Sequence, residues 1–250
     1  MELLVSDQPS PQRDAAGWLS NLPDGLRAVG SAVPGGFERY VRILHPAQVG
    51  PRAATWAEIA AWSGRRLSPD SDSQQLMVHG DGARWDEQLG HGCPEEGPAG
   101  PGEAGLRRLY ELLAEATDTP DHLWLLIDVV EYDVPMPTGG YTSAWGDTRG
   151  PSRTAERRLL LQKELEQRCG VSVAGDRFIL HRGALAATGG RWMQFPSYWW
   201  PQDRSWLVYT HIDSTSTYVA GDERLVERLL HDDLLEVVEA QLDHPFDGHT

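Results

Sequence analysis

One aromatic and polar stretch near the end of the chain, residues 197–221, constrains the fold more than any other. From Ser205 to Asp213, large apolar side chains recur with the two-residue period of a β-strand. The pattern predicts a half-buried strand. One face carries Trp206, Val208 and Ile212, and the other carries Leu207, Tyr209, His211 and Asp213.

The residues before this strand predict a corner. Pro201 has no N–H to donate, so Trp199, Trp200 and Pro201 are not expected to continue a central strand. We expect the two indole rings to flank the mouth of the strand. Asp203 and Arg204 follow, and either brace the corner through a charge-assisted hydrogen bond or face a ligand.

Patterns along the rest of the chain predict an α+β fold, a mixed and mainly antiparallel sheet packed against several helices, in a single domain over residues 1–250. Segments rich in Gly, Pro and acids, at about 79–104 and 132–152, are expected to be long surface loops. Segment 234–242 fits either a strand or a helix. We expect strands at 39–45, 122–130 and 177–184, and helices at 13–20, 55–63, 103–116, 153–169 and from 222 onwards.

Charge limits the classes of partner. The chain has 22 basic and 37 acidic side chains and a formal net charge of −15, which disfavours nucleic acids and anionic membranes and favours a basic protein. Residues 203–250 hold eleven Asp or Glu against three Arg. The alternative reading is a solvated surface that keeps the protein soluble. If a partner binds here, the candidate acids are Asp222, Glu223, Glu227, Asp232 and Asp233.

The sequence predicts neither a metal site nor a cofactor. Cys93 and Cys169 lie far apart without the spacing of metal ligands. His91, Cys93 and Glu95 are too few donors for a closed site in a Gly/Pro-rich tract. No apolar run approaches the roughly 18 residues of a membrane span, and no basic segment precedes the first apolar patch. We therefore expect a cytoplasmic protein.

Two blocks, residues 37–47 and 197–221, resemble a family of uncharacterised actinobacterial proteins. In that family a Trp-Trp-Pro-x-Asp-Arg-x-Trp segment leads to an acid, Ile-Asp, Ser-Thr and Tyr-Val-x-Gly. Here His211 stands where the family has the acid, which puts in doubt any role built on two carboxylates at 211 and 213. The resemblance implies no activity.

A more distant likeness is to the SUKH group of immunity proteins. It rests on Leu22-Pro23, on residues 34–40 followed by a strand, and on a late strand with an acidic helix. Members of that group are α+β proteins that bind and neutralise toxins, often basic nucleases. The likeness implies an immunity-like role.

Two hypotheses about function follow. The first is a non-catalytic acidic protein that binds another protein, with no catalytic residues. The second is an enzyme or small-ligand binder with a pocket walled by tryptophans. Its walls would be Trp199, Trp200 and Tyr209, and its polar groups Asp203, Arg204, His211 and Asp213. A binding module should present a flat acidic face, whereas an enzyme should bring polar groups together in a deep cleft.

Overall fold

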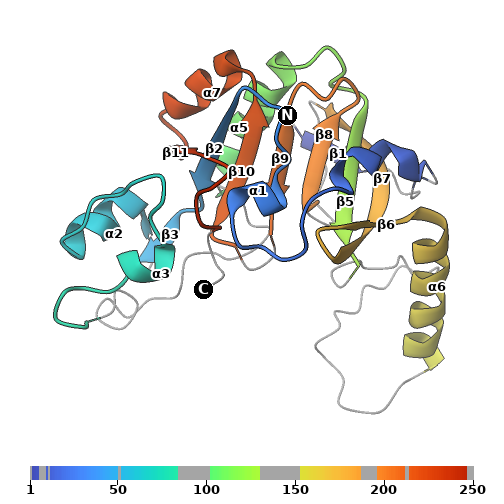
Figure 1. Ribbon diagram of the computed structural model, residues 1–250, viewed down its shortest axis with the longest axis horizontal. Helices are drawn as coiled ribbons and strands as arrows, with labels where there is room; N and C mark the ends of the chain where they lie inside the picture. Colours follow the sequence, from blue (N-terminus) through green and yellow to red (C-terminus); the bar gives the residue numbers. More distant parts are fainter. Residues whose placement is uncertain are drawn as a thin grey trace.

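The computed structural model describes residues 2–5, 10, 12–49, 52–83, 102–129, 153–186, 196–211 and 214–246. It has the predicted α+β architecture, a large sheet with helices on both faces (Figure 1). The loop expected at 132–152 lies outside the described residues, as do residues 84–101 of the loop expected at 79–104.

The described strands form a sheet in which every pairing is antiparallel. The order across the sheet is β1 (Glu2–Val5), β7 (Asp176–Ala186), β5 (Leu123–Asp128), β8 (Tyr198–Pro201), β9 (Leu207–Thr210), β10 (Ser216–Gly221), β2 (Arg39–Leu44) and β11 (Glu236–Ala240). A further strand, β6 (Gly170–Val173), pairs with β7 beside β1, and a turn with positive φ at Ala174 (52°) and Gly175 (90°) joins β6 to β7.

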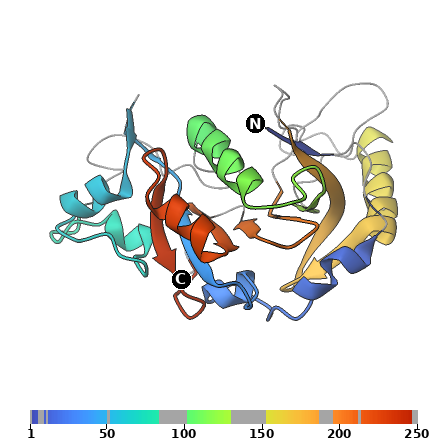
Figure 2. The ribbon, with the colours of Figure 1, turned by 90° about the horizontal axis from the view of Figure 1, so that it is seen from above.

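Helices cover both faces of this sheet. Helices α5 (Gly102–Glu115) and α7 (Glu223–Leu230) pack on one face, whereas the 3-10 helix η1 (Arg13–Leu19) and the short α1 (Val29–Ala32) pack on the other. Seen from above, α5 and α1 lie on opposite sides of the strands (Figure 2). Helix α6 (Arg153–Cys169) flanks β6 and β7 at one end of the molecule.

A small lobe occupies the other end of the molecule (Figures 1 and 2). It consists of the hairpin β3 (Ala47–Val49) and β4 (Arg52–Ala54) with helices α2 (Trp56–Trp62) and α3 (Ser73–Leu76), and we call it the α2 lobe. Its own apolar cluster centres on Trp56 and Ile59. The indole N–H of Trp56 donates to the carbonyl of His45 at 2.8 Å, which ties the lobe to the end of β2.

The helix starts follow the local sequence signals. Thr55 and Glu58 form the predicted capping box of α2, since each side chain accepts from the other residue's backbone N–H. Asp222 caps α7 by accepting from the N–H of Leu225 at 2.7 Å. These caps fix where the two helices begin.

The sheet has one apolar core on each face. Strand β9 places Val208 in the core under α5 and α7, and Leu207 and Tyr209 in the core on the opposite face. The predicted alternation is therefore confirmed. The expectation of a half-buried strand is wrong, because all four residues of β9 are buried under helices or loops.

Candidate functional site

The expected corner at Trp199 and Trp200 is a strand. Both residues lie in β8, which pairs with β5 and β9 in the middle of the sheet. The prediction was wrong because Pro201 is the last residue of β8 and lies beyond the pairing with β9. A proline at this position therefore removes no bond between β8 and β9.

The two tryptophan rings point to opposite faces of the sheet. Both side chains have 0% exposure. The Trp199 ring lies 5.4 Å from the rings of Tyr110 and Trp206, in the core under α5. The Trp200 ring lies 5.7 Å from the ring of Trp18, in the other core. A single pocket walled by both rings is inconsistent with this geometry.

Tyr209 shares a face with Trp200 and is also buried. Its ring lies 4.2 Å from the ring of Tyr198 and 5.9 Å from that of Phe246. Burial holds the pKa of the Tyr209 hydroxyl well above its usual value. The residue therefore works as a core side chain in the described structure.

His211 is half-buried at the end of β9, and its ring lies 6.4 Å from that of Phe246. Asp213 lies outside the described residues. A ligand shared by His211 and Asp213 therefore stays a prediction from strand parity.

Asp203 braces the exposed turn between β8 and β9. Its carboxylate accepts hydrogen bonds from the Thr117 hydroxyl at 2.7 Å, the Asp118 N–H at 2.9 Å and both the N–H and hydroxyl of Ser205 at 3.0 and 2.8 Å. Burial acts to raise the pKa of Asp203, but these hydrogen bonds outweigh it and lower the pKa. The turn is thereby tied to the segment that follows α5.

Arg204 interacts with an aromatic ring instead of Asp203. Its φ is 56°, and its guanidinium carbon lies 5.2 Å from the centre of the Trp18 ring. This is the geometry of a cation–π contact. The two charged residues therefore brace different parts of the turn, and of the two only Asp203 reaches the hollow described next.

A hollow of about 190 Å³ lies between the end of α5, the β8–β9 turn and the start of α7. Arg228 is paired with one of the lining carboxylates, that of Glu115, at 2.8 Å. The charged residues that line the hollow are four acids and two arginines, namely Glu115, Asp118, Asp203, Asp222, Arg224 and Arg228. The hollow thus brings Asp203, singled out from the sequence, together with Asp222 at the start of α7.

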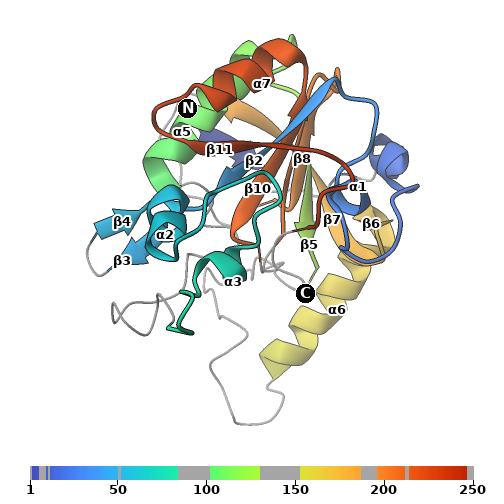
Figure 3. The ribbon, with the colours of Figure 1, turned by 60° about the vertical axis from the view of Figure 1, so that its left-hand side comes forward.

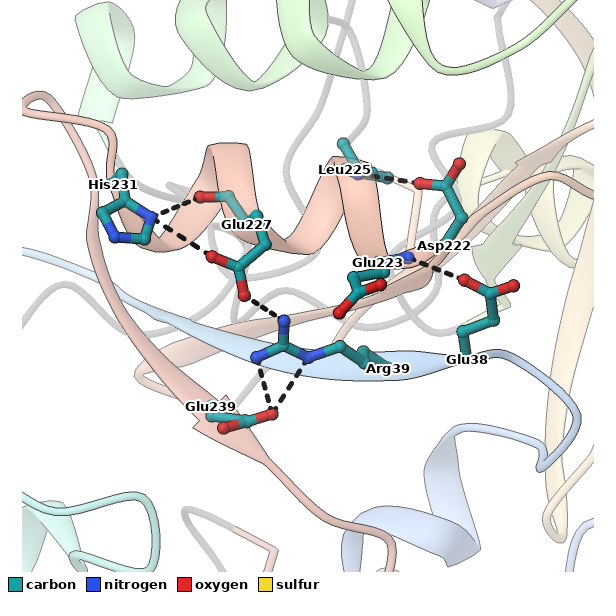
Figure 4. A network of polar contacts seen from close by, with 8 residues as sticks. All are labelled: Glu38, Arg39, Asp222, Glu223, Leu225, Glu227, His231 and Glu239. Atoms are coloured by element: carbon teal, nitrogen blue, oxygen red, sulfur yellow. Dashed lines mark hydrogen bonds and ion pairs between the residues drawn. The ribbon is translucent and has the colours of Figure 1, made fainter.

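A second acidic group runs along α7 to β11 (Figure 4). Arg39 of β2 lies between two carboxylates, bonding to Glu227 and, at 2.9 and 3.1 Å, to Glu239. The hydrogen bond from Arg39 lowers the pKa of Glu227, and that bond together with Glu239 raises the pKa of Arg39. His231 Nδ1 lies 3.6 Å from the Glu227 carboxylate. The group has more carboxylates than guanidiniums.

The five acids expected to recognise a partner fall into two classes. Asp222 caps α7, Glu227 binds Arg39, and Asp232 accepts from Arg108 at 2.6 Å. Glu223 and Asp233 are exposed, and their side chains make no hydrogen bond or ion pair with the described residues. Only the last two therefore offer carboxylates that are not already used by the fold.

A buried polar cluster lies where β2 and β9 end and β10 begins, and the sequence did not predict it. His45 has 0% exposure, and its Nε2 lies 2.9 Å from the Thr217 hydroxyl, which lies 2.8 Å from that of Thr210. Arg42 donates to the Ser216 hydroxyl at 2.8 Å. The run of Ser and Thr from 214 to 217 was the only sign of this cluster in the sequence. It does not reveal that residues of β2 and β9 supply the partners of these hydroxyls.

Within the described ranges, no group of three or more His, Cys, Asp or Glu side chains is placed to hold a metal ion. Cys169 is buried, and burial raises the pKa of its thiol. Among the helices in the same part of the chain, none is both long and apolar enough to cross a membrane.

No family model, curated protein or solved structure matches this chain. The resemblances to the actinobacterial family and to the SUKH group therefore stay predictions from the sequence blocks. The site rests on its own geometry, which consists of the hollow, α7 and β11.

Proposed function

We propose that this protein is a non-catalytic, acidic protein-binding protein whose partner is basic. The observation that carries the proposal is the hollow beside α7, in which four carboxylates face two guanidiniums. We use the name α7 surface for this hollow, the exposed side of α7, the segment 231–235 that follows it, and β11.

Electrostatics supports a basic partner. One of the two arginines at the hollow, Arg228, is already paired with Glu115, so the remaining carboxylates leave the hollow negative. A concave surface with an excess of one sign of charge focuses the field and attracts groups of the opposite sign. The net charge of −15 adds a long-range attraction for a basic protein and a repulsion for nucleic acids.

The SUKH likeness suggests a specific form of the proposal, an immunity-like role in which the partner is a basic toxin. We place this binding in the cytoplasm, where a free buried thiol such as that of Cys169 stays reduced. The alternative pocket walled by Trp199 and Trp200 receives no support, because the rings belong to different cores.

The test is affinity capture from the native host, with mass spectrometry of the retained proteins, followed by binding measurements with the purified partner. The test variant reverses three exposed acids of the α7 surface whose side chains make no bond with described residues, Asp118→Lys, Glu223→Lys and Asp233→Lys. We expect association to slow at least about tenfold, since steering by opposite charge accelerates association by this order or more.

The matched control reverses the charge of three exposed acids elsewhere, Asp14→Lys, Asp24→Lys and Glu164→Lys, and so changes the net charge equally. It should slow association much less, because those charges lie away from the surface that binds. A partner bound equally well by the test variant, or a retained partner that is itself acidic, would overturn the proposal.

A further inference from the structure

The backbone of β11 has hydrogen-bonding groups that point away from the sheet. The bonding pattern of β2 shows which of these groups point away. His45, directly after β2, lies opposite Thr215 in the β2–β10 register and donates its N–H to the Thr215 carbonyl at 2.8 Å. In an antiparallel ladder, alternate residues bond to opposite neighbours. Val41 and Ile43 therefore face β10, whereas Tyr40, Arg42 and Leu44 face β11.

The register of β11 with β2 then fixes which groups are open. Glu236, Val238 and Ala240 lie opposite Leu44, Arg42 and Tyr40 and bond to β2. Val237 and Glu239 direct their N–H and C=O groups outward, and no described residue bonds to these groups. In Figure 3, β11 lies at the front of the sheet with the α2 lobe below it.

Side chains around this edge are acidic and partly apolar. Glu239 is exposed on the strand, and Glu227 of α7 joins it through Arg39, so two carboxylates share one guanidinium (Figure 4). Leu234, just before β11, is 62% exposed. An incoming strand would therefore meet open backbone groups, negative charge and one large apolar side chain.

The charge selects the occupant. Pairing with a second copy would bring two sets of these carboxylates together and join two chains that each carry −15. Like charges placed opposite each other in a sheet are destabilising, and charged side chains on edge strands oppose self-association. A strand rich in Lys or Arg has the complementary charge.

We propose that β11 binds an extended basic segment of the partner, which adds to the sheet as a further strand. This inference rests on the proposed function and names the surface that carries it. Main-chain bonds to Val237 and Glu239 supply affinity, and alternate basic side chains of the segment meet the carboxylates beside the edge.

The test is amide hydrogen exchange measured residue by residue by NMR, with a synthetic peptide of about eight alternating Lys and Val residues as the probe. Without peptide, the amides of Val237 and Glu239 should exchange faster than those of Val238 and Ala240. With peptide, exchange at Val237 and Glu239 should slow about tenfold or more, while that at Val238 changes little. A peptide of alternating Glu and Val should have no such effect.

A variant pair tests the same edge. Val237→Pro removes an N–H that β2 does not use, so the fold should persist, whereas the peptide should no longer protect Glu239. Val237→Thr keeps the N–H and the β-branch and should retain protection. If Val237→Pro does not fold, the exchange experiment on the natural protein decides.

Calorimetry with the same peptide separates this inference from the proposed function. Binding of the Lys/Val peptide without protection of Val237 and Glu239 would overturn strand addition and leave an acidic binding surface in place. Absence of peptide binding, or equal protection by the Glu/Val peptide, would also overturn strand addition, and the capture experiment would then judge the proposed function separately.

Discussion

Trp206 shows how one side chain connects two elements. It has 0% exposure, its indole N–H donates to the carbonyl of Leu113 at 2.9 Å, and its ring lies 5.4 Å from that of Trp199. The residue precedes β9, whereas Leu113 belongs to the last turns of α5. Trp206 therefore fastens the helix to the strand through both packing and a hydrogen bond.

We expect Trp206→Ala to lower the free energy of unfolding by about 3–5 kcal/mol, because it empties a large buried volume. It also leaves the Leu113 carbonyl without this donor. Trp206→Phe should cost less, since it keeps part of the ring. Denaturant unfolding of both variants measures the difference, and a loss of less than about 1 kcal/mol for the alanine variant would contradict the core assignment.

Asp203 gives a prediction about acid stability. The pKa of Asp203 is lowered in the folded protein. At pH values below the ordinary pKa of about 3.9, the Asp203 carboxylate is therefore protonated more often in the unfolded chain than in the folded one. The stability it contributes is present above that value and is lost as the pH falls through the lowered pKa.

Asp203→Asn should therefore flatten the fall of stability at acid pH. Unfolding measured between about pH 5 and about pH 2 gives the slope, and Asp121→Asn, at an exposed acid without a side-chain hydrogen bond to described residues, serves as the control. Equal slopes for the two variants would exclude a special role for Asp203.

At the scale of elements, β11 holds the α2 lobe in place. Glu236 accepts hydrogen bonds from the N–H groups of Trp56 and Ala57 at 2.6 and 2.8 Å, the first residues of α2. The capping box provides an acceptor, the Thr55 hydroxyl, for the N–H of Glu58. The free N–H groups at the start of α2 are therefore satisfied partly from within the lobe and partly from the main sheet. Burial raises the pKa of Glu236.

Glu236→Ala should destabilise the α2 lobe by about 1–2 kcal/mol, because two N–H groups lose their acceptor. Glu236→Gln keeps an acceptor oxygen and should cost less. Hydrogen exchange of the α2 amides reports the local change, with the amides of α7 as an internal control. Faster exchange at α7 and α2 alike would indicate a global loss of stability instead.

Elements with strong local signals were predicted well from the sequence. The helix expected at 153–169 is α6, and the strand expected at 39–45 is β2 to within one residue. Segment 234–242, left open between strand and helix, contains β11. By contrast, β8 was missed because the role of Pro201 depends on where pairing with β9 ends, which is a property of the neighbouring strand.

For the whole molecule, net charge is the dominant electrostatic property. A chain with −15 repels itself in the folded state, and its exposed ion pairs contribute little to stability. We expect the melting temperature to rise as salt increases from about 0.01 M to about 0.15 M, because the screening length falls from about 30 Å to about 8 Å.

The control variant with Lys at 14, 24 and 164 carries less negative charge, so its melting temperature should depend less on salt. Differential scanning calorimetry at both salt concentrations measures the two slopes. A melting temperature of the natural protein that falls with salt would mean that attractive ion pairs, such as those of Arg39, outweigh the repulsion.

The candidate site was predictable only in part at this scale. The acidic last fifth of the chain, with Asp203 in it, was evident from the sequence, but the hollow also takes Glu115 from the end of α5 and Asp118 from the segment after it. No spacing along the chain relates these residues to Asp222, because folding alone brings them together. The same holds for Arg39, which neutralises part of the acidic group from a strand almost two hundred positions away.

The adjacent residues Trp199 and Trp200 leave the register of β8 with its neighbouring strands poorly specified, and Pro201 specifies it. A shift of β8 by one residue turns every side chain to the other face, but here one of the two indole sites would still receive an indole, so side-chain size opposes the slip less than in a strand with a single large ring. Gln202 donates its N–H to the backbone carbonyl of His122, next to β5, at 2.8 Å, so the nitrogen of Pro201 points away from β5. After a shift of one residue, the Pro201 nitrogen would point towards β5. Since proline has no N–H, one hydrogen bond between β8 and β5 would then be missing. The proline that ends the strand thus also sets its alignment.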